Sequence, residues 1–174
     1  MRIGFDSKRL YSNFSGLGNY SRSLVKNVQA LYSDNEYFLY SPKIKKAPET
    51  TFFYDNTNFK TYLAKTIFKA FWRIFSILNQ LKKDDVQLYH GLSNELPLNL
   101  KKYDIKSVVT IHDLIFKVLP ETYPLIDRNI YDIKFRKACL QADKVIAISN
   151  STKTDIINFY GINPDKIEVV YQSC

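Results

Sequence analysis

Short apolar runs alternate with helix-like patterns along most of the 174-residue chain. Runs rich in β-branched and aromatic residues, bounded by polar or turn-forming positions, predict β-strands. These runs occupy residues 2–6, 36–41, 51–54, 86–91, 107–113, 144–149 and 166–171. The runs at 86–91, 107–113 and 144–149 are almost continuously apolar, which is typical of strands covered on both faces in a parallel sheet.

Apolar residues at helical spacing predict the segments between the strands. The first such set is Leu17, Tyr20, Leu24, Val28 and Leu31, and a later set is Ile126, Ile130, Ile133 and Leu140. A short helix over 150–160 is expected to end at Gly161, with Pro164 just beyond it. Alternating strands and helices predict an α/β fold with a Rossmann-like, doubly wound, mostly parallel sheet, in a single domain over residues 1–174.

The stretch from Lys60 to Lys83 is predicted to be one long basic amphipathic helix. Its polar face would carry Lys65, Lys69 and Arg73, and Trp72 would lie near the polar boundary. Two interpretations remain open. Either the apolar face packs on the sheet and the lysines are solvated, or the helix rests on anionic lipid together with the nearby KIKK sequence.

Composition narrows the class of partner without selecting one. A net charge of +8 favours anionic partners, namely a phosphorylated substrate, an anionic membrane or nucleic acid. No nucleic-acid-binding motif is present, so nucleic acid is not expected. The sequence shows no secretory signal and no apolar run of about 18 residues, and its two cysteines cannot form a disulfide framework. A cytoplasmic location is therefore expected, with Cys139 as a small buried apolar residue.

Polar residues recur where the predicted strands end. In open α/β sheets, ligands bind beyond the carboxyl ends of the strands. The residues at these ends are Asp6 with the following glycine loop, His90 with Gly91, His112 with Asp113, and Ser149 with Asn150. The only two histidines of the chain both belong to this group. A histidine there could bond a sugar hydroxyl or phosphate, act as an acid or base, or simply be satisfied by the backbone.

The glycine loop GLGNYS by itself is only a weak indication of phosphate binding. It lacks the third glycine of a dinucleotide fingerprint, and no GK[ST] follows as in a Walker loop. Glycines at the start of a helix can nevertheless expose N–H groups to an anion. The competing interpretation is a simple turn. Ser149 is expected to cap the helix that follows it. The histidines lack metal-binding spacing, so no metal is expected.

Four stretches together resemble a known enzyme family: GLGNYSRSL, YHGLSNELP, VVTIHDLIFKVLPETYP and ADKVIAISNSTKTDIINFYGINPDKIEVVY. Their order and spacing are similar to those of the N-terminal domain of GT-B retaining glycosyltransferases of family 4. That group includes mannosyltransferases and enzymes of bacterial capsule, O-antigen and other surface-polysaccharide synthesis. The resemblance implies two Rossmann-like domains with a cleft between them. The N-terminal domain would bind the acceptor. The C-terminal donor-binding domain would be absent from residues 1–174, so the chain alone is expected to be inactive.

The resemblance also assigns roles to residues. The loop formed by Gly16, Leu17, Gly18 and Asn19 would reach the diphosphate of the nucleotide-sugar donor, and His112 would be the catalytic residue that contacts the transferred sugar. The candidates for contact with the acceptor or its sugar are His90, Asn94, Asp113, Ser149 and Asn150. No cofactor or metal would be needed.

The implied partners are a nucleotide-sugar and a glycan or lipid-linked acceptor, with peripheral contact to the inner face of the cytoplasmic membrane. Two other interpretations stay open. One is a non-catalytic Rossmann-like module that holds a phosphorylated ligand. The other is a membrane-surface protein whose main feature is the basic helix.

Overall fold

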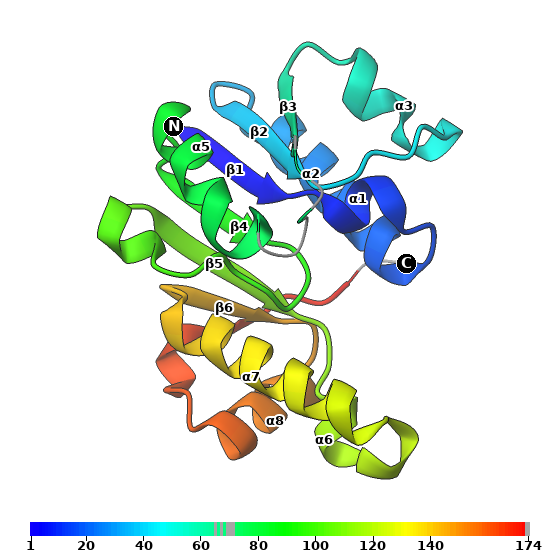
Figure 1. The fold of residues 1–174 in the computed structure, drawn as a ribbon, viewed down its shortest axis with the longest axis vertical. Helices are drawn as coiled ribbons and strands as arrows, with labels where there is room; N and C mark the ends of the chain where they lie inside the picture. The colour runs from blue at the N-terminus through cyan, green and yellow to red at the C-terminus, as the bar shows by residue number, and fades with distance from the viewer. Residues whose placement is uncertain (65, 67, 69–71, 173–174) are drawn as a thin grey trace.

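A seven-stranded, all-parallel sheet forms the centre of the protein in a computed structural model that describes residues 1–64, 66, 68 and 72–172 (Figure 1). The strands lie in the order β3-β2-β1-β4-β5-β6-β7. Their bounds are β1 Arg2–Asp6, β2 Glu36–Ser41, β3 Phe59–Leu63, β4 Leu88–Gly91, β5 Lys106–Ile111, β6 Lys144–Ala147 and β7 Ile167–Val169. The predicted doubly wound α/β class is confirmed.

Helices cover both faces of this sheet. Their bounds are α1 Lys8–Ser12, α2 Gly16–Leu31, α3 Pro48–Asp55, α5 Ile77–Lys83, α6 Ile115–Val118, α7 Leu125–Gln141 and α8 Asn150–Tyr160. A π-helical turn, η1, spans Trp72–Ser76, and short 3-10 turns are η2 Leu100–Tyr103, η3 Pro120–Thr122 and η4 Pro164–Lys166.

The two sheet faces bury two separate cores. Strand β2 shows the alternation, because Tyr37 and Leu39 belong to one core while Phe38 and Tyr40 belong to the other. The first core lies under α1, α2 and α3, and the second under α5, α7 and α8. Burial on both faces explains why the central strands are almost continuously apolar in sequence.

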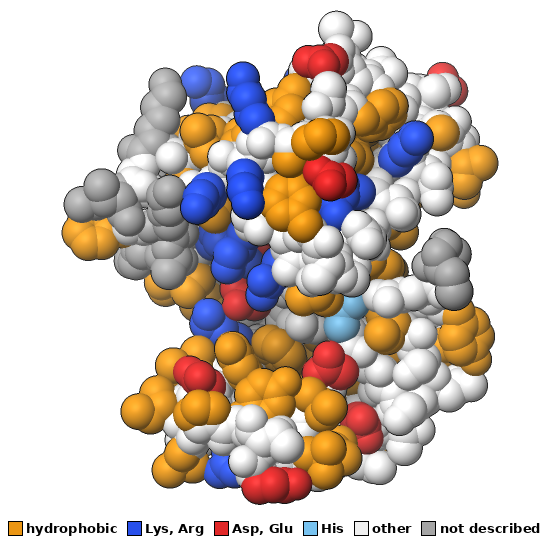
Figure 2. All heavy atoms as spheres, turned by 90° about the vertical axis from the view of Figure 1, so that its right-hand side faces the viewer, with side chains coloured by type: hydrophobic (Ala, Val, Ile, Leu, Met, Phe, Trp, Pro, Cys, Tyr) orange, Lys and Arg blue, Asp and Glu red, His pale blue; other side chains and the backbone are white. Residues whose placement is uncertain are grey.

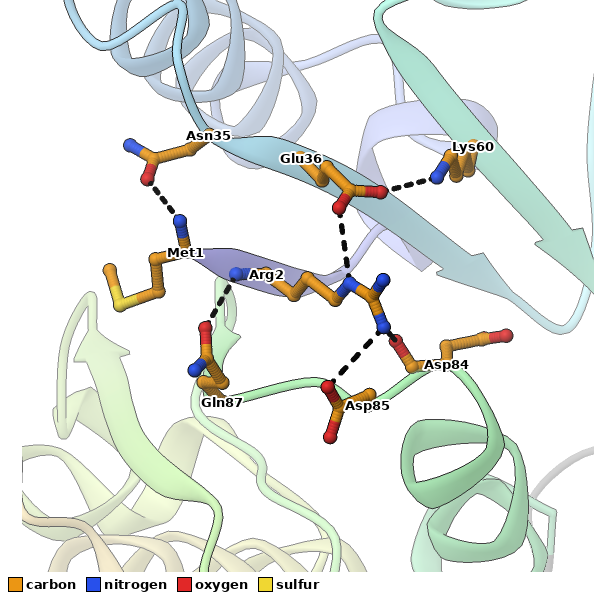
Figure 3. A network of polar contacts seen from close by, with 8 residues as sticks. All are labelled: Met1, Arg2, Asn35, Glu36, Lys60, Asp84, Asp85 and Gln87. Carbon is orange, nitrogen blue, oxygen red and sulfur yellow. Dashed lines mark hydrogen bonds and ion pairs between the residues drawn. The ribbon is translucent and has the colours of Figure 1, made fainter.

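Exposed charges connect the strands at the edge of the sheet where they begin (Figure 3). Glu36 on β2 accepts hydrogen bonds from Arg2 on β1, at 3.1 Å, and from Lys60 on β3. Arg2 also pairs with Asp85 at 3.3 Å, just before β4. These side chains are largely exposed, so the pairs contribute little to stability and mainly help to set strand register.

The predicted strand at 51–54 is wrong, since these residues lie in α3. Pro48 occupies the first turn, where its fixed φ and missing N–H suit a helix. The Thr50 hydroxyl accepts a hydrogen bond from the Ala47 N–H at 3.1 Å, which closes the helix start. The third strand comes later, at Phe59–Leu63.

The single long helix predicted from Lys60 to Lys83 is also wrong. Its first residues form β3, and among the described residues of this segment helix is found from Trp72 onward, as η1 and then α5. Trp72 is buried and stacks on Tyr62 rather than lying at a polar boundary. Arg73 is held in buried ion pairs, while Lys65 and Lys69 lie outside the described residues. Because β3 takes the first residues of the segment and Arg73 is buried, the described residues of 60–83 do not form the expected continuous basic face.

The predicted apolar sets of α2 and α7 differ in where they lie. In α2 the buried residues are Gly18, Ser21, Arg22 and Val25, Leu24 and Val28 are half-buried against the core, and Leu31 is exposed. In α7 the buried residues are Phe135, Ala138 and Cys139, and the predicted apolar set faces solvent. Helical spacing identified both helices, but in α7 the apolar row lies on the side away from the sheet.

The caps of α8 agree with the sequence. The Ser149 hydroxyl accepts a hydrogen bond from the Thr152 N–H at 3.1 Å, and Gly161 ends the helix in the left-handed region, at φ 63°. Cys139 is free and fully buried, and burial raises the pKa of its thiol to about 12. Within the part of the chain that the structure describes, no helix is long and apolar enough to cross a membrane.

Candidate functional site

The strand order reverses at β1, which pairs with β2 on one side and β4 on the other. A doubly wound sheet opens a crevice at such a reversal, outside the carboxyl ends of the strands. Asp6 ends β1, His90 and Gly91 end β4, and His112 directly follows β5. The residues predicted from strand ends therefore gather along one edge of the sheet, which faces the viewer in Figure 2.

His112 is held by contacts to both ring nitrogens. Its Nε2 lies 2.9 Å from the Leu92 carbonyl oxygen, so Nε2 carries the proton and donates. Its Nδ1 then accepts from Gln172 Nε2 at 2.9 Å. The Tyr20 ring meets the imidazole edge to face, with centroids 4.8 Å apart. Burial lowers the pKa of His112, so the ring is neutral near pH 7 and presents a lone pair at Nδ1.

The glycine loop is fixed at the start of α2, where both glycines lie in the first helical turn. Asn13 Oδ1 accepts hydrogen bonds from the N–H groups of Ser15 and Gly18, each at 3.0 Å. A Cβ on Gly18 would lie only 1.8 Å from the Asn13 carbonyl oxygen, so no larger residue fits there. At Gly16 a Cβ would meet nothing within 4 Å. The two glycines therefore have different structural requirements.

Arg22 connects this loop to α1. Its guanidinium donates to the carbonyl oxygens of Leu10 and Asn13, both at 2.9 Å, and to Asn19 Oδ1 at 2.5 Å. Ser21 occupies the position of the third glycine in a dinucleotide fingerprint, and its hydroxyl donates to the Leu17 carbonyl oxygen at 2.7 Å. The next residue, the buried Arg22, holds the loop that precedes the helix.

A groove of about 380 Å³ runs beside the start of α2. Its lining includes Gly16, Asn19 and Tyr20 from the helix and Gln172 from the C-terminal segment. His112 does not line the groove itself, but two of the lining residues, Tyr20 and Gln172, contact its ring. Figure 2 shows a histidine side chain in the hollow between the upper and lower parts of the molecule. The arrangement could hold an elongated anionic ligand between the helix start and a neutral imidazole.

His90 lies deeper than His112. Its Nε2 is 2.9 Å from Thr110 Oγ1, and the Tyr20 hydroxyl lies 2.9 Å from the same oxygen. The ring also packs beside Phe5. Burial, and secondarily a charge on His112, lowers the pKa of His90 to about 4. His90 supports the position of Tyr20 through Thr110, and its predicted contact with an acceptor stays a prediction.

The buried, neutral His90 should make stability depend on pH. Its pKa is about 4 in the folded chain and near the ordinary value of 6.5 when unfolded, so its contribution is fully present above pH 6.5 and is lost as pH falls toward 4. Between pH 7 and about pH 4.5 the free energy of unfolding should fall by about 2 kcal/mol from this residue. Urea unfolding of wild type and of His90→Gln at both pH values measures this fall in the free energy of unfolding. An equal fall in both proteins would contradict the assignment.

The other predicted residues occupy distinct places. Asn94, in the left-handed region, accepts the His112 backbone N–H on Oδ1 at 2.9 Å and so fixes that turn. Asp113 is exposed and accepts the Ile115 N–H at 3.2 Å. Ser149 caps α8, and Asn150 Nδ2 donates to the Tyr171 hydroxyl at 3.0 Å. Leu17 is half-buried in α2. Their contacts with a ligand stay predictions.

Sequence reasoning missed an ion-pair cluster at the end of β1. Arg73 bonds Asp6 at 2.5 Å and Glu95 at 3.0 Å, and Glu95 also pairs with Lys134 at 3.3 Å. The sequence predicts Arg73 on the polar face of a basic helix, whereas its side chain is mostly buried. Asp6 was noted as a strand end, which is the one sequence signal for this cluster. Tyr20 and Gln172 were missed as well, because nothing near them in sequence indicates contact with His112.

The fold and the carboxyl-edge crevice define a doubly wound, Rossmann-like domain. Residues 14–173 match the family described as Glycosyltransferase Family 4, and the chain belongs to that family. No curated protein matches the chain.

Solved structures of glycosyltransferases share the fold. One is the apo form of the lipopolysaccharide outer core galactosyltransferase WaaB, with 15% identity and a TM-score of 0.58 over 100% of this chain and 46% of that one. Another is a glycosyltransferase from Rickettsia africae ESF-5, with 18% identity and a TM-score of 0.59 over 99% of this chain and 43% of that one. The chain thus spans less than half the length of either structure.

Proposed function

We propose that this chain is the acceptor-side domain of a retaining glycosyltransferase. The enzyme would move a sugar from a nucleotide-sugar to a glycan or lipid-linked acceptor. The observation that carries the proposal is the groove beside the first turn of α2, whose lining residues Tyr20 and Gln172 contact His112 at the carboxyl edge of a family 4 domain. A second Rossmann-like domain would close this groove and hold most of the donor, consistent with the length of the two similar structures.

The start of α2 would stabilise the leaving diphosphate. Negative charge develops on the diphosphate as its bond to the sugar breaks, and preorganised N–H groups at a helix start stabilise such charge. Gly16 lines the groove, and the adjacent Leu17 N–H lies in the same first turn. The Gly18 N–H donates to Asn13 Oδ1, so Gly18 contributes through close packing of the loop.

His112 would bind the transferred sugar. In its neutral ring the Nε2–H group donates to the Leu92 carbonyl oxygen, and this hydrogen bond would be kept. The other nitrogen, Nδ1, accepts from the Gln172 amide. A sugar hydroxyl that replaces the Gln172 amide would donate to Nδ1. Tyr20 would keep the imidazole plane in position through its edge-to-face contact. Asp113, which directly follows His112 and is exposed, is a predicted candidate for contact with the acceptor.

The biological setting belongs to the proposal too. The donor would carry mannose or another hexose. The enzyme would act in the synthesis of capsule, O-antigen or a related surface polysaccharide. Both parts of the proposal come from the resemblance of the four sequence stretches to family 4 glycosyltransferases. We propose no metal or cofactor, because α2 and basic side chains would supply the positive potential at the diphosphate.

Sugar transfer by the protein encoded by the complete reading frame tests this function. The protein would be incubated with a panel of UDP- and GDP-sugars and polyprenyl-linked or glycan acceptors. Release of nucleoside diphosphate and the anomeric configuration of the product would both be measured, the latter by NMR. The expected result is release with one donor class and a product that keeps the donor's anomeric configuration. Inversion would overturn the retaining mechanism, and binding of a nucleotide-sugar without transfer to any acceptor would favour the non-catalytic module.

A further inference from the structure

Two cations at the carboxyl edge of the sheet have no counter-ion of their own. Lys8 and Arg9, which we call the cation pair, follow the end of β1 and lie in α1, and both are half-buried. Neither side chain forms a hydrogen bond or an ion pair with a residue that the structure describes. A half-buried cation loses part of its hydration, so leaving it unpaired costs free energy. The cation pair therefore favours an anion beside it.

The carboxylates near Lys8 are already paired with other cations. Asp6 accepts from Arg73, and Glu95 pairs with Arg73 at 3.0 Å and with Lys134 at 3.3 Å. Burial lowers the pKa of Lys8, and the charge of Arg73 lowers it further. Asp6 and Glu95 act in the opposite direction but do not offset these effects. This part of the carboxyl edge thus carries more cationic than anionic side chains.

Arg9 brings positive charge close to His112. Burial is the main cause of the lowered pKa of His112, and the charge of Arg9 adds to it. Figure 2 shows Lys and Arg side chains in the same hollow as a histidine. Asp113, the carboxylate that follows His112, is exposed and accepts the Ile115 N–H. An anion at the cation pair would therefore lie near the histidine that the proposed reaction uses.

The cation pair is separate from the groove beside α2. None of the described residues that line this groove is a lysine or an arginine, and Lys8 and Arg9 are not among them. In the groove, N–H groups at the start of α2 would hold the donor diphosphate. Tyr20 contacts the His112 ring from the groove, whereas Arg9 acts on the same ring from α1. Two anionic groups could thus be held next to one histidine, each by a different element.

We propose that the cation pair binds a phosphate group of the acceptor. This assignment rests on the proposed function, because the groove beside α2 already serves the phosphates of the donor. A lysine ammonium and an arginine guanidinium both form strong charge-assisted hydrogen bonds with phosphate oxygens. The substrate class is thereby narrowed to acceptors that carry phosphate near the reacting hydroxyl, as a sugar phosphate or a diphosphate-linked glycan does. A neutral acceptor would leave both cations unpaired.

Binding of inorganic pyrophosphate to the 174-residue chain tests the cation pair without sugar transfer. In calorimetry, Lys8→Gln/Arg9→Gln should bind about tenfold more weakly than wild type, because two charge-assisted contacts are lost. Its melting temperature should be no lower than that of wild type, since unpaired charges are removed. Lys82→Gln/Lys83→Gln is the matched control, because it removes the same charge from exposed lysines in the last turn of α5 and should leave binding unchanged.

Kinetics of the protein encoded by the complete reading frame show which substrate carries the anion. With a glycosyl 1-phosphate or a polyprenyl diphosphate-linked glycan as acceptor, Lys8→Gln/Arg9→Gln should raise the acceptor KM about tenfold and leave the donor KM unchanged within about twofold. The phosphate source is the acceptor on which the variant has this effect. With the same glycan lacking phosphate, wild type and variant should have equal KM values. A rise in the donor KM instead, or an equal rise with and without acceptor phosphate, would overturn the proposal.

Failure of the cation pair and failure of the proposed function give different results. If the complete protein transfers sugar but Lys8→Gln/Arg9→Gln changes neither pyrophosphate binding nor the acceptor KM, the proposed function holds and the acceptor-phosphate site is overturned. If the complete protein transfers no sugar while the same variant still weakens pyrophosphate binding, the proposed function fails and the cation pair remains an anion site of a non-catalytic module. An equal loss of binding in Lys82→Gln/Lys83→Gln would reduce the effect to net charge and overturn the site.

Discussion

Replacing His112 by alanine should lower the turnover of the enzyme that carries this domain by about a hundredfold, the size expected when a polar group that acts in the transition state is removed. Donor binding should change only several-fold, because the second domain would hold most of the donor. The physical reason is the acceptor at His112 Nδ1, which bonds Gln172, a residue that lines the groove. Turnover is measured as nucleoside diphosphate release under saturating donor, and donor affinity by calorimetry.

Two conservative variants separate catalysis from support of the fold. His112→Gln can keep a donor near the Leu92 carbonyl oxygen but places no acceptor at the Nδ1 position. His112→Asn places its amide oxygen close to Nδ1 and can accept there. We expect His112→Asn to retain more turnover than His112→Gln, with similar melting temperatures. Unchanged turnover in His112→Ala, or losses that follow melting temperature alone, would remove His112 from the mechanism.

Substituting Gly18 by alanine should lower the free energy of unfolding by about 4 kcal/mol, near the upper end for a single substitution, because the clash is with backbone. The new Cβ would lie 1.8 Å from the Asn13 carbonyl oxygen and 2.6 Å from its carbon. Relief requires the loop before α2 to move, which would also break the Arg22 hydrogen bonds to Leu10 and Asn13. Urea unfolding followed by circular dichroism measures the effect.

Gly16 provides the matched control two residues earlier in the same loop. A Cβ at Gly16 meets nothing within 4 Å, so Gly16→Ala should change stability by less than about 1 kcal/mol, and toward greater stability if the helical propensity of alanine dominates. Similar losses of stability in the two variants would show that loop flexibility, and not the contact with Asn13, is what requires glycine.

The edge of the sheet that carries the candidate site was predictable because parallel strands bring their carboxyl ends together. His90 and His112 each follow an apolar run, and that position alone placed them on one edge. How deeply each of the two imidazole rings is buried was not predictable. His90 is held by Thr110, 20 positions away in sequence, and Tyr20 bonds Thr110 from 90 positions away, so no local pattern encodes this packing.

The face that a helix turns inward was the least predictable feature. Helical spacing marks an apolar row on α7, but it does not say whether the row meets the sheet or another partner. Phe135, Ala138 and Cys139 pack inward, and the isoleucines remain outside. The same limit applies to segment 60–83, where alternating basic and apolar residues resembled one helix. There Arg73 is drawn inward by Asp6 and Glu95, and carboxylates that distant in sequence leave no local signal.

The most direct test of the central claim compares sugar transfer by two samples, the protein encoded by the complete reading frame and the 174-residue chain alone. Both would receive the same nucleotide-sugar and acceptor, and radiolabelled product would be counted. The proposed role as the acceptor-side half of a glycosyltransferase predicts transfer by the complete protein and none above background by the chain. Transfer by the chain alone at a comparable rate, or none by the complete protein with any donor class, would contradict it.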